Sequence, residues 1–360
     1  MSDYKEFARE LLSLAGLSGY EKPVRESIKN KWSPLVEDIW VSPLGSLHAI
    51  KRGTGSEPRK KLLVATHMDA VGMMVTKVDG EYIRFTSVGG LDPRVLPFQE
   101  VIVHGRELIA GMIGMPSDRH LPEQWQGKAV PMDHLFIDTG LGADRVKSLV
   151  RPGDLVSFAN LPLELDGETL MGHTQDDRAA IVAMTICLEL LQSRKHGWDL
   201  VAAATVQEEV GLKGAKTSGF AEMPDLAIAI DVGFAKEPGA SGYFLLDPGS
   251  GPALGWGPVT NPMLYRMVES VANKNGIPFS KEINPAGRTG TDADALSLVG
   301  MGIPTLVMSV PLRFMHSPVE IVRYEDMYHT GRLIAELMTA LDDESMGSIR
   351  WDDENIQEKA

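Results

Sequence analysis

The sequence contains a single cysteine, Cys187, so no disulfide can form within the chain. This cysteine lies in the apolar run IVAMTICLELL, which favours a buried and unreactive thiol. The chain also lacks an apolar segment long enough to cross a bilayer, because the N-terminal helix predicted around Phe7, Leu11 and Leu14 is amphipathic and carries acidic residues. We therefore expect no signal peptide, no membrane span and a cytoplasmic location.

Basic residues are in deficit. Acidic residues outnumber them by 49 to 35, which gives a formal net charge of −14. A protein that follows nucleic-acid phosphates needs the opposite balance, so nucleic acid is not an expected partner. Aromatic residues make up only 6% of the chain and its six tryptophans are scattered, so no aromatic platform for a sugar is evident.

The length and the pattern of the chain predict two domains. Its 360 residues exceed the ~250 to 300 at which single hydrophobic cores tend to split. Residues 70–161 read as short alternating strands separated by glycine and proline, whereas longer helices and strands surround them. This predicts an α/β domain, with a mixed sheet between helices, from residues 1–69 and 162–343, and a small inserted β-barrel-like domain at 70–161. Within the insertion, the polar segment 115–134 is too long for a plain connection and is expected to be a lid, an interface or a mobile segment. Residues 344–360 are expected to form an acidic, solvated tail.

Three buried apolar runs are each followed at once by histidine or acidic residues. LLVATHMDA carries His67 and Asp69, ATVQEEVG carries Glu208 and Glu209, and LAIAIDVG carries Asp231. In open α/β sheets, ligands gather outside the carboxyl ends of the strands. We therefore expect these side chains to meet at one edge of the sheet.

Two further motifs add candidate ligands. GHTQDDRAA places Asp176 and Asp177 at the start of a helix, and FMHSPVE places His316 one loop after a strand. Nitrogen and oxygen donors without thiolates suit zinc, cobalt or manganese at an open catalytic site. Each residue also has a plain structural alternative: helix capping for the aspartates, a core position for His67 and a surface loop for His316. The remaining histidines are interpreted as structural, although His173 lies only three residues before Asp176.

Seven motifs stand in the order and spacing of one enzyme family: SGYEKPVR, THMDAVG, GHTQDDR, VQEEVGLKGA, IDVG, TGTDADAL and MHSPVEIV. Over roughly residues 4–341 the chain resembles the M42 metallo-aminopeptidases, which are related to glutamyl and deblocking aminopeptidases and include relatives labelled as endoglucanases. The resemblance implies a zinc-peptidase-like α/β catalytic domain with an inserted β-rich dimerisation domain. It also implies peptide substrates, dimers assembled into a hollow dodecamer, and two divalent metal ions per subunit, with zinc or cobalt ahead of manganese.

Carried over to the matching positions, the resemblance implies metal-ligand roles for five residues: His67, Asp176, Glu209, Asp231 and His316. Among these, Asp176 resembles the carboxylate that bridges both metals. Glu208 resembles the general base that takes a proton from the attacking water and passes it to the leaving amine. Asp69 resembles the acid that orients His67. The expected reaction is hydrolysis of the N-terminal peptide bond of peptides.

Several alternatives stay open. The sequence HTQDD leaves Asp177 as a second candidate for the bridging position of Asp176. Asp292 and Asp294 either favour a basic or small N-terminal residue of the substrate or cap the following helix. A metal-dependent dipeptidase or deacylase could use the same core, and a glycoside hydrolase could use two of the same carboxylates. A non-catalytic scaffold would lack a ligand, and none is missing. The segment 115–134 could line the site of a neighbouring subunit.

Overall fold

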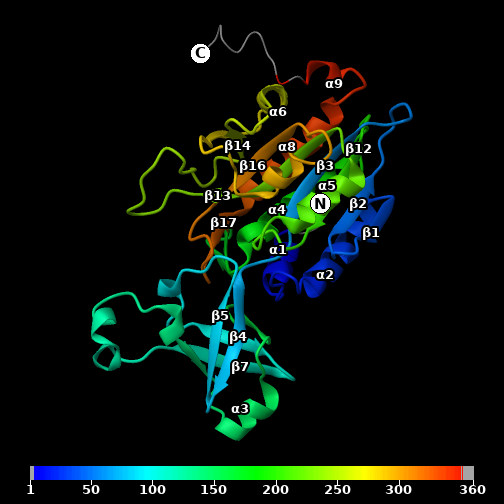
Figure 1. The fold of residues 1–360 in the computed structure, drawn as a ribbon. Helices are drawn as coiled ribbons and strands as arrows, with labels where there is room; N and C mark the ends of the chain where they lie inside the picture. Colours follow the sequence, from blue (N-terminus) through cyan, green and yellow to red (C-terminus); the bar gives the residue numbers. More distant parts are fainter. Residues whose placement is uncertain (1–3, 350, 352–360) are drawn as a thin grey trace.

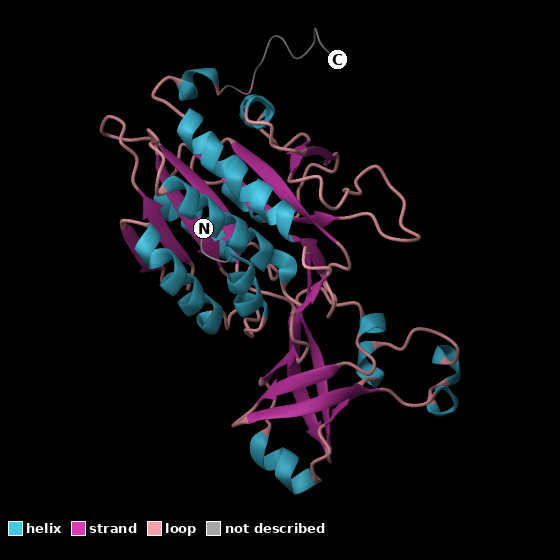
Figure 2. Cartoon of the chain, turned by 180° about the vertical axis from the view of Figure 1, so that it is seen from behind, coloured by secondary structure: helices cyan, strands magenta, loops and turns pink. Residues whose placement is uncertain are grey.

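The structure is a computed structural model that describes residues 4–349 and residue 351. It contains a large α/β body and a β-barrel that extends from one end of it (Figures 1 and 2). The strands are β1 (Asp38–Val41), β2 (Leu47–Lys51), β3 (Lys61–His67), β4 (Gly72–Asp79), β5 (Tyr82–Val88), β6 (Glu100–His104), β7 (Leu108–Gly114), β8 (Phe136–Asp138), β9 (Leu155–Phe158), β10 (Leu163–Leu165), β11 (Thr169–Met171), β12 (Asp199–Thr205), β13 (Leu226–Phe234), β14 (Ala253–Trp256), β15 (Ser280–Ile283), β16 (Thr305–Leu312) and β17 (Ile321–Arg323). The α-helices are α1 (Tyr4–Leu12), α2 (Lys22–Trp32), α3 (Ala143–Leu149), α4 (Gln175–Leu191), α5 (Lys213–Glu222), α6 (Pro262–Lys274), α7 (Asp292–Leu296), α8 (Tyr324–Ala340) and α9 (Ser345–Ser348).

The body is built on a mixed sheet of eight strands in the order β1-β2-β12-β3-β13-β16-β14-β15. The four strands β12, β3, β13 and β16 are parallel to one another. Helices cover both faces, which explains why these strands are nearly continuous apolar runs. In β3, Leu62 and Val64 lie in the core shared with α4 and α8, whereas Leu63 and Ala65 lie in the core shared with α5 and α7.

The barrel is closed by six antiparallel strands in the order β4-β5-β8-β7-β6-β9. Buried and more exposed side chains alternate along β6, where Val101 and Val103 are buried and Glu100 is exposed. Alternation of this kind fills the interior of a small barrel, which here has a hydrophobic core of its own. The predicted fold class, an α/β body on a mixed sheet with a β-barrel-like insertion, is confirmed. The division at residues 69/70 and 161/162 stays a prediction.

Some predicted elements end elsewhere. Strand β13 continues through Asp231 to Phe234, so Asp231 lies within the strand and not after it. Helix α4 begins with non-helical backbone at Asp176 and Asp177, and the peptide bond between them is cis. Strands β14 and β15 were not predicted, because their four-residue sequences lie among glycines and prolines and carry little periodicity.

Segment 115–134 projects from the barrel in Figure 1 and holds three single-turn 3-10 helices, η3 (Asp118–His120), η4 (Glu123–Trp125) and η5 (Met132–His134). The predicted acidic tail includes α9, while residues 350 and 352–360 lie outside the described residues. Within the described part of the chain, no helix is both long enough and apolar enough to cross a bilayer.

Trp32 gives a test of the packing of α2 against α4. Its side chain is fully buried, and its Nε1 donates a hydrogen bond of 2.8 Å to Thr185 Oγ1. Trp32→Ala is expected to lower the free energy of unfolding by about 3–5 kcal/mol, because it leaves a large cavity. Urea unfolding followed by circular dichroism measures this. The control is Trp351→Ala, at a site 55% exposed, which should change the free energy of unfolding by less than about 0.5 kcal/mol. An equal loss of stability in the two variants would contradict the packing of Trp32 between α2 and α4.

Candidate metal centre

The five predicted ligands meet at the carboxyl edge of the central sheet. His67 is the last residue of β3, and Asp231 lies near the end of the neighbouring strand β13. Glu209 follows β12 and His316 follows β16, each by a short loop. Asp176 comes from the start of α4. The parallel order of β12, β3, β13 and β16 explains the convergence, because it brings their carboxyl ends to one edge.

Asp176 lies between the two histidines. Its Oδ1 is 3.0 Å from His67 Nε2, and its Oδ2 is 3.2 Å from His316 Nε2. Each histidine has a further acid on the same nitrogen: Asp231 Oδ1 lies 3.9 Å from His67 Nε2, and Glu209 Oε2 lies 3.2 Å from His316 Nε2. The arrangement therefore has two halves, each with one histidine and one acid, joined through the two oxygens of one carboxylate.

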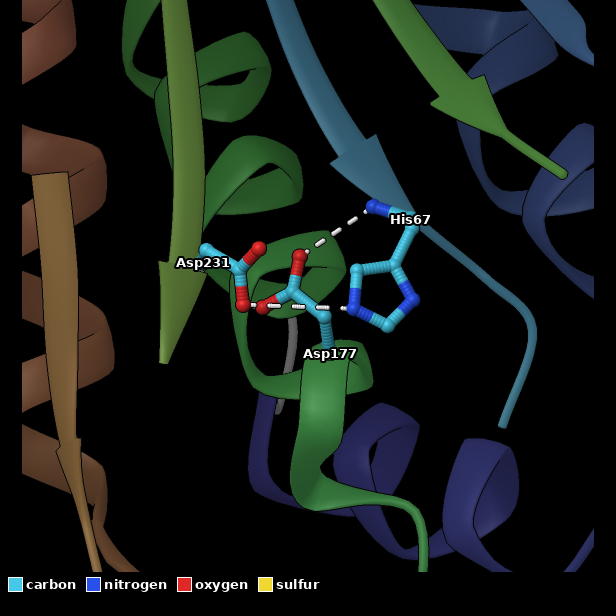
Figure 3. Close-up of side chains that lie close together, drawn as sticks. All are labelled: His67, Asp177 and Asp231. Carbon is cyan, nitrogen blue, oxygen red and sulfur yellow. Dashed lines mark hydrogen bonds and ion pairs between the residues drawn. The ribbon is translucent and has the colours of Figure 1, made fainter. Parts of the chain in front are cut away.

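Asp177 lies in the same cluster but makes different contacts (Figure 3). Its Oδ2 accepts a hydrogen bond of 3.1 Å from the backbone N–H of His67, while its Oδ1 is buried and has no hydrogen-bond partner. Ligand atoms of His67, Asp177 and Asp231 lie within 4.8 Å of one another, as do those of His67, Asp176 and Glu209. Asp176 alone of the two aspartates faces both histidines, which favours it for the position between two cations.

Asp69 holds both His67 and the loop that carries the glutamates. His67 Nδ1 lies 3.1 Å from the carbonyl oxygen of Asp69 and 3.6 Å from its carboxylate. A carbonyl can only accept, so Nδ1 donates there and the neutral ring keeps a lone pair on Nε2 for a cation. The fully buried Asp69 carboxylate also accepts the backbone N–H groups of Glu208 and Glu209 at 2.9 and 3.3 Å, and the hydroxyl of Ser18 at 2.6 Å.

The cluster contains more buried acidic groups than basic ones. Burial raises the pKa of Glu208 to about 10, and the charge of Asp231 adds to this, against the opposite effect of His67. Burial likewise raises the pKa of Asp231 and of Glu209, with the nearby carboxylate of Asp176 adding to both. Such crowding of buried acids is costly without positive charge beside them.

The residues present fit divalent cations. Two imidazole nitrogens and several carboxylate oxygens form a donor set that zinc, cobalt and manganese accept. Glu209 Oε1 is buried and has no hydrogen-bond partner, so a donor atom is available in the cluster. A cation would also offset the repulsion between the acids. Ionised carboxylates only accept hydrogen bonds, so they cannot relieve this repulsion by bonding to one another.

Glu320 is a supporting residue that the sequence did not reveal. It is 1% exposed, and its two oxygens accept the backbone N–H of His316 at 2.8 Å and of Asp176 at 3.2 Å. It thereby fixes the backbone of two candidate ligands at once. The signal in the sequence was an acid four residues after His316 in MHSPVE, which by itself is common.

Backbone conformation marks the same region. Thr174, Gln207 and His316 have φ values of 74°, 56° and 58°, in the left-handed region that non-glycine residues seldom adopt. Each lies at a candidate ligand or within two residues of one. Strained positions of this kind cluster at functional sites, where surrounding contacts hold them.

Three other residues discussed from the sequence lie outside the cluster. His173 contacts the carbonyl oxygens of Val71 and Ser317, and burial lowers its pKa to about 4, as befits a structural histidine. Asp294 accepts from the backbone N–H groups of the preceding loop, and Asp292 accepts a hydrogen bond from a threonine of β12. Neither caps α7, because its N-terminal N–H bonds to the side chain of Thr291.

The cluster opens into a cavity of about 450 Å³. Asp176, Glu208 and Glu209 line one part of it, and residues of β13, β15 and β16 and of the loops that follow these strands line the rest. The aromatic side chains of Phe234, Tyr243 and Phe244 also line it and are substantially exposed. A small ligand can therefore reach Glu208 and the candidate metal ligands together.

Comparison with known proteins places the chain in one family. Residues 45–333 match the model of the M42 glutamyl aminopeptidase family. A curated relative, a lysyl aminopeptidase of Pyrococcus furiosus, is 32% identical over 342 residues, which cover 93% of this chain and 97% of that protein.

Solved structures of similar proteins point to the same family. An aminopeptidase from the archaeon Desulfurococcus kamchatkensis is similar with a TM-score of 0.88 and 32% identity, over 96% of this chain and 97% of that one. The TET1 peptidase of Pyrococcus horikoshii, described as assembling into a tetrahedron or a large octahedral shell, has a TM-score of 0.82 and 31% identity over 94% and 100% of the chains. A protein of Thermotoga maritima described as an endoglucanase has a TM-score of 0.76 and 30% identity over 95% and 99%. The chain belongs to the M42 glutamyl aminopeptidase family and is a peptide-hydrolysing enzyme.

Proposed function

We propose that this protein is a two-metal aminopeptidase that removes residues from the N-terminus of peptides. The observation that carries the proposal is the position of Asp176, whose two oxygens lie 3.0 and 3.2 Å from the facing nitrogens of His67 and His316. A carboxylate in this position can bridge two cations and offset their mutual repulsion. Asp231 would complete the half with His67, and Glu209 the half with His316.

The residues around the bridge divide the chemistry among them. Divalent cations, zinc or cobalt ahead of manganese, would supply the Lewis acidity that polarises the peptide carbonyl and makes water more acidic. Glu208, which lines the cavity, would take a proton from the attacking water and return it to the leaving amine. Asp69 would keep this base in place, because its carboxylate accepts the backbone N–H of Glu208 at 2.9 Å.

The charge of the cavity supports action on a free N-terminus. Buried acids, among them Glu208 and Asp231, surround the place where the reaction would occur and favour a positively charged amino group there. A dipeptidase or deacylase would use the same core. A glycoside hydrolase would instead rely on a carboxylate pair and on an aromatic platform for the sugar. The aromatic rings that line this cavity are those of phenylalanine and tyrosine, and none of the described tryptophans lines it.

Metal removal tests the proposal. Aminoacyl-p-nitroanilides with free and with N-acetylated amino groups would be offered to chelator-treated protein, with and without added zinc, cobalt or manganese. Chelation is expected to remove nearly all cleavage, one or more of these ions should restore it, and the acetylated substrates should be cleaved at least about 100-fold more slowly. Equal release of p-nitroaniline from acetylated substrates would indicate an endopeptidase, and release of acetate without p-nitroaniline would indicate a deacylase. Cellulose hydrolysis that survives chelation would indicate a glycosidase.

We also propose that the barrel mediates self-association into dimers and that these assemble into a dodecamer. Large apolar side chains of the barrel, Phe98, Leu108 and Met112, are exposed and would be available for contact with a partner subunit. Segment 115–134, which projects from the barrel, would then be placed to line the cavity of a neighbouring subunit (Figure 1).

Light scattering coupled to size-exclusion chromatography tests the assembly. A particle of twelve subunits is expected at working concentration, and deletion of the tip of segment 115–134 should alter activity without changing metal content. A monomer with full activity would overturn the proposal for assembly and leave the hydrolytic function intact. A cytoplasmic location stays a prediction.

A further inference from the structure

One carboxylate of the cavity has no part in the proposed chemistry. Glu282 lies on β15, at the edge of the sheet, and lines the same cavity as Glu208 and Asp231. Its Oε2 accepts a hydrogen bond of 2.5 Å from Ser309 Oγ on β16, two strands away. On the intervening strand β14, the residue paired with Glu282 is Gly255, which has no side chain to cover the carboxylate.

The position of Ser309 ties Glu282 to the metal cluster. Ser309 is the register partner of Asp231 across β13 and β16, so the two side chains leave the same face of the sheet one strand spacing apart, about 4.8 Å. Two residues further along β13, Gly233 allows these groups to pack closely, because a Cβ there would lie 2.7 Å from Leu246 Cδ1, 2.9 Å from Ser309 Cβ and 3.5 Å from Glu282 Oε1. Asp231, Ser309 and Glu282 all line the same cavity, so one ligand can reach both carboxylates.

Glu282 has no lysine or arginine partner among the residues that the structure describes. The cavity lining contributed by the described part of the chain includes no lysine or arginine, and the only side chain that affects the pKa of Glu282 there is Ser309. The neighbouring Lys281 lies over the rings of Trp256 and Tyr265, at 4.5 and 5.5 Å from their centroids. Burial raises the pKa of Glu282, against the effect of the hydrogen bond from Ser309, as expected for an acid that lacks a positive partner.

The remaining lining suits a long side chain with an apolar stem. Phe234, Tyr243 and Phe244 form a group of edge-to-face rings, with centroids 6.3 and 5.8 Å apart, at the same cavity. Lysine and arginine bury their methylene stems along apolar surface while the charged head contacts a polar partner. The stem of lysine spans roughly 6 Å from Cα to Nζ, which is comparable to the strand spacing that separates Asp231 from Ser309.

We infer that Glu282 gives this enzyme a preference for substrates with lysine or arginine at the N-terminus. The ammonium or guanidinium group of that side chain pairs with Glu282 Oε1, while the amino group and the peptide bond of the same residue lie at the metal cluster. The inference rests on the proposed aminopeptidase function. It concerns a different acid from Asp292, which accepts a hydrogen bond from a threonine of β12, and from Asp294, which accepts from the loop before α7.

Norleucine provides the sharpest comparison, because it has the four-carbon chain of lysine without the charge. Values of kcat/KM would be measured on lysyl-, arginyl-, norleucyl- and glutamyl-p-nitroanilide with the metal-loaded wild-type protein. Lysyl and arginyl substrates are expected to exceed the norleucyl substrate by at least about tenfold, the size of one hydrogen bond to a charged group, and the glutamyl substrate should be the slowest.

Glu282→Gln keeps the shape and the contact with Ser309 but removes the charge. The ratio of kcat/KM for lysyl over norleucyl substrate should fall at least about tenfold, mainly through KM, because the head is held equally in ground and transition states. Damage to the fold would instead lower both values together. Glu81→Gln removes the same charge from an exposed turn of the barrel and should leave the ratio unchanged.

The outcomes separate this inference from the proposed function. Wild-type protein that cleaves the norleucyl substrate as fast as the lysyl substrate would overturn the inference alone. Failure to cleave any free-amino substrate with any metal would overturn both. Competitive inhibition of the wild-type enzyme by free L-lysine and by L-norleucine needs no variant; equal inhibition constants would also contradict a role for Glu282.

Discussion

Glu208→Gln is expected to lower kcat by roughly 10²- to 10⁴-fold, the usual contribution of a positioned general base. Glutamine matches glutamate in size but has no oxygen basic enough to take a proton from water. The backbone N–H of residue 208 would still bond to Asp69, so the loop should keep its position. Steady-state kinetics on a cleaved aminoacyl-p-nitroanilide, with metal content measured by atomic absorption, tests the expectation.

The neighbouring acid is the matched control. Glu209→Gln removes a charge from the adjacent position, where Oε2 lies 3.2 Å from His316 Nε2, and is expected to weaken metal binding. Excess metal should therefore restore part of its activity, whereas no metal concentration should rescue Glu208→Gln. A Glu208→Gln variant with more than about a tenth of wild-type kcat would transfer the role of base to another group.

Asp176→Asn is expected to reduce kcat/KM on the order of 10³-fold or more and to lose at least one of the two metals. An amide has a single oxygen, so the variant side chain could bind a cation beside His67 or beside His316 but could not bridge the two. Charge stabilisation by a bound cation contributes several kcal/mol to such reactions, which corresponds to this factor. Kinetics and metal titration by calorimetry measure the two effects.

Asp177→Asn distinguishes between the two adjacent aspartates. The oxygen of the amide can still accept the backbone N–H of His67, which the carboxylate accepts at 3.1 Å. The expected loss is therefore that of a supporting residue, about 10- to 100-fold. If Asp177→Asn were the variant that lost metal while Asp176→Asn kept it, the bridging position would belong to Asp177.

Much of the candidate site was accessible from the sequence because its residues stand beside strong local signals. His67, Glu208 and Asp231 each lie at or just beyond the end of a buried apolar run, and parallel strands bring such ends together. The α/β body and the barrel were predicted for a related reason: the period of the apolar residues changes at the insertion and changes back after it.

The supporting contacts were not accessible in this way. Glu320 bonds to the backbone of Asp176, 144 residues earlier in the chain, and Asp69 bonds to the backbone of Glu208, 139 residues later. No local sequence pattern indicates that a carboxylate will accept a hydrogen bond from a backbone N–H group far away in the chain. The two strands that complete the sheet, β14 and β15, were missed because four residues carry too little periodicity, and Glu282 was missed with them.

The sequence by itself determined the family, the fold class and the donor atoms available, because residue types and their order along the chain carry that information. The tertiary structure decided which oxygen of Asp176 faces which histidine, which backbone groups Asp69 and Glu320 hold, and that Glu282 lies in the same cavity as Glu208. These depend on strand register and on contacts between distant segments. A shift of one residue in the register would turn a side chain to the opposite face of the sheet.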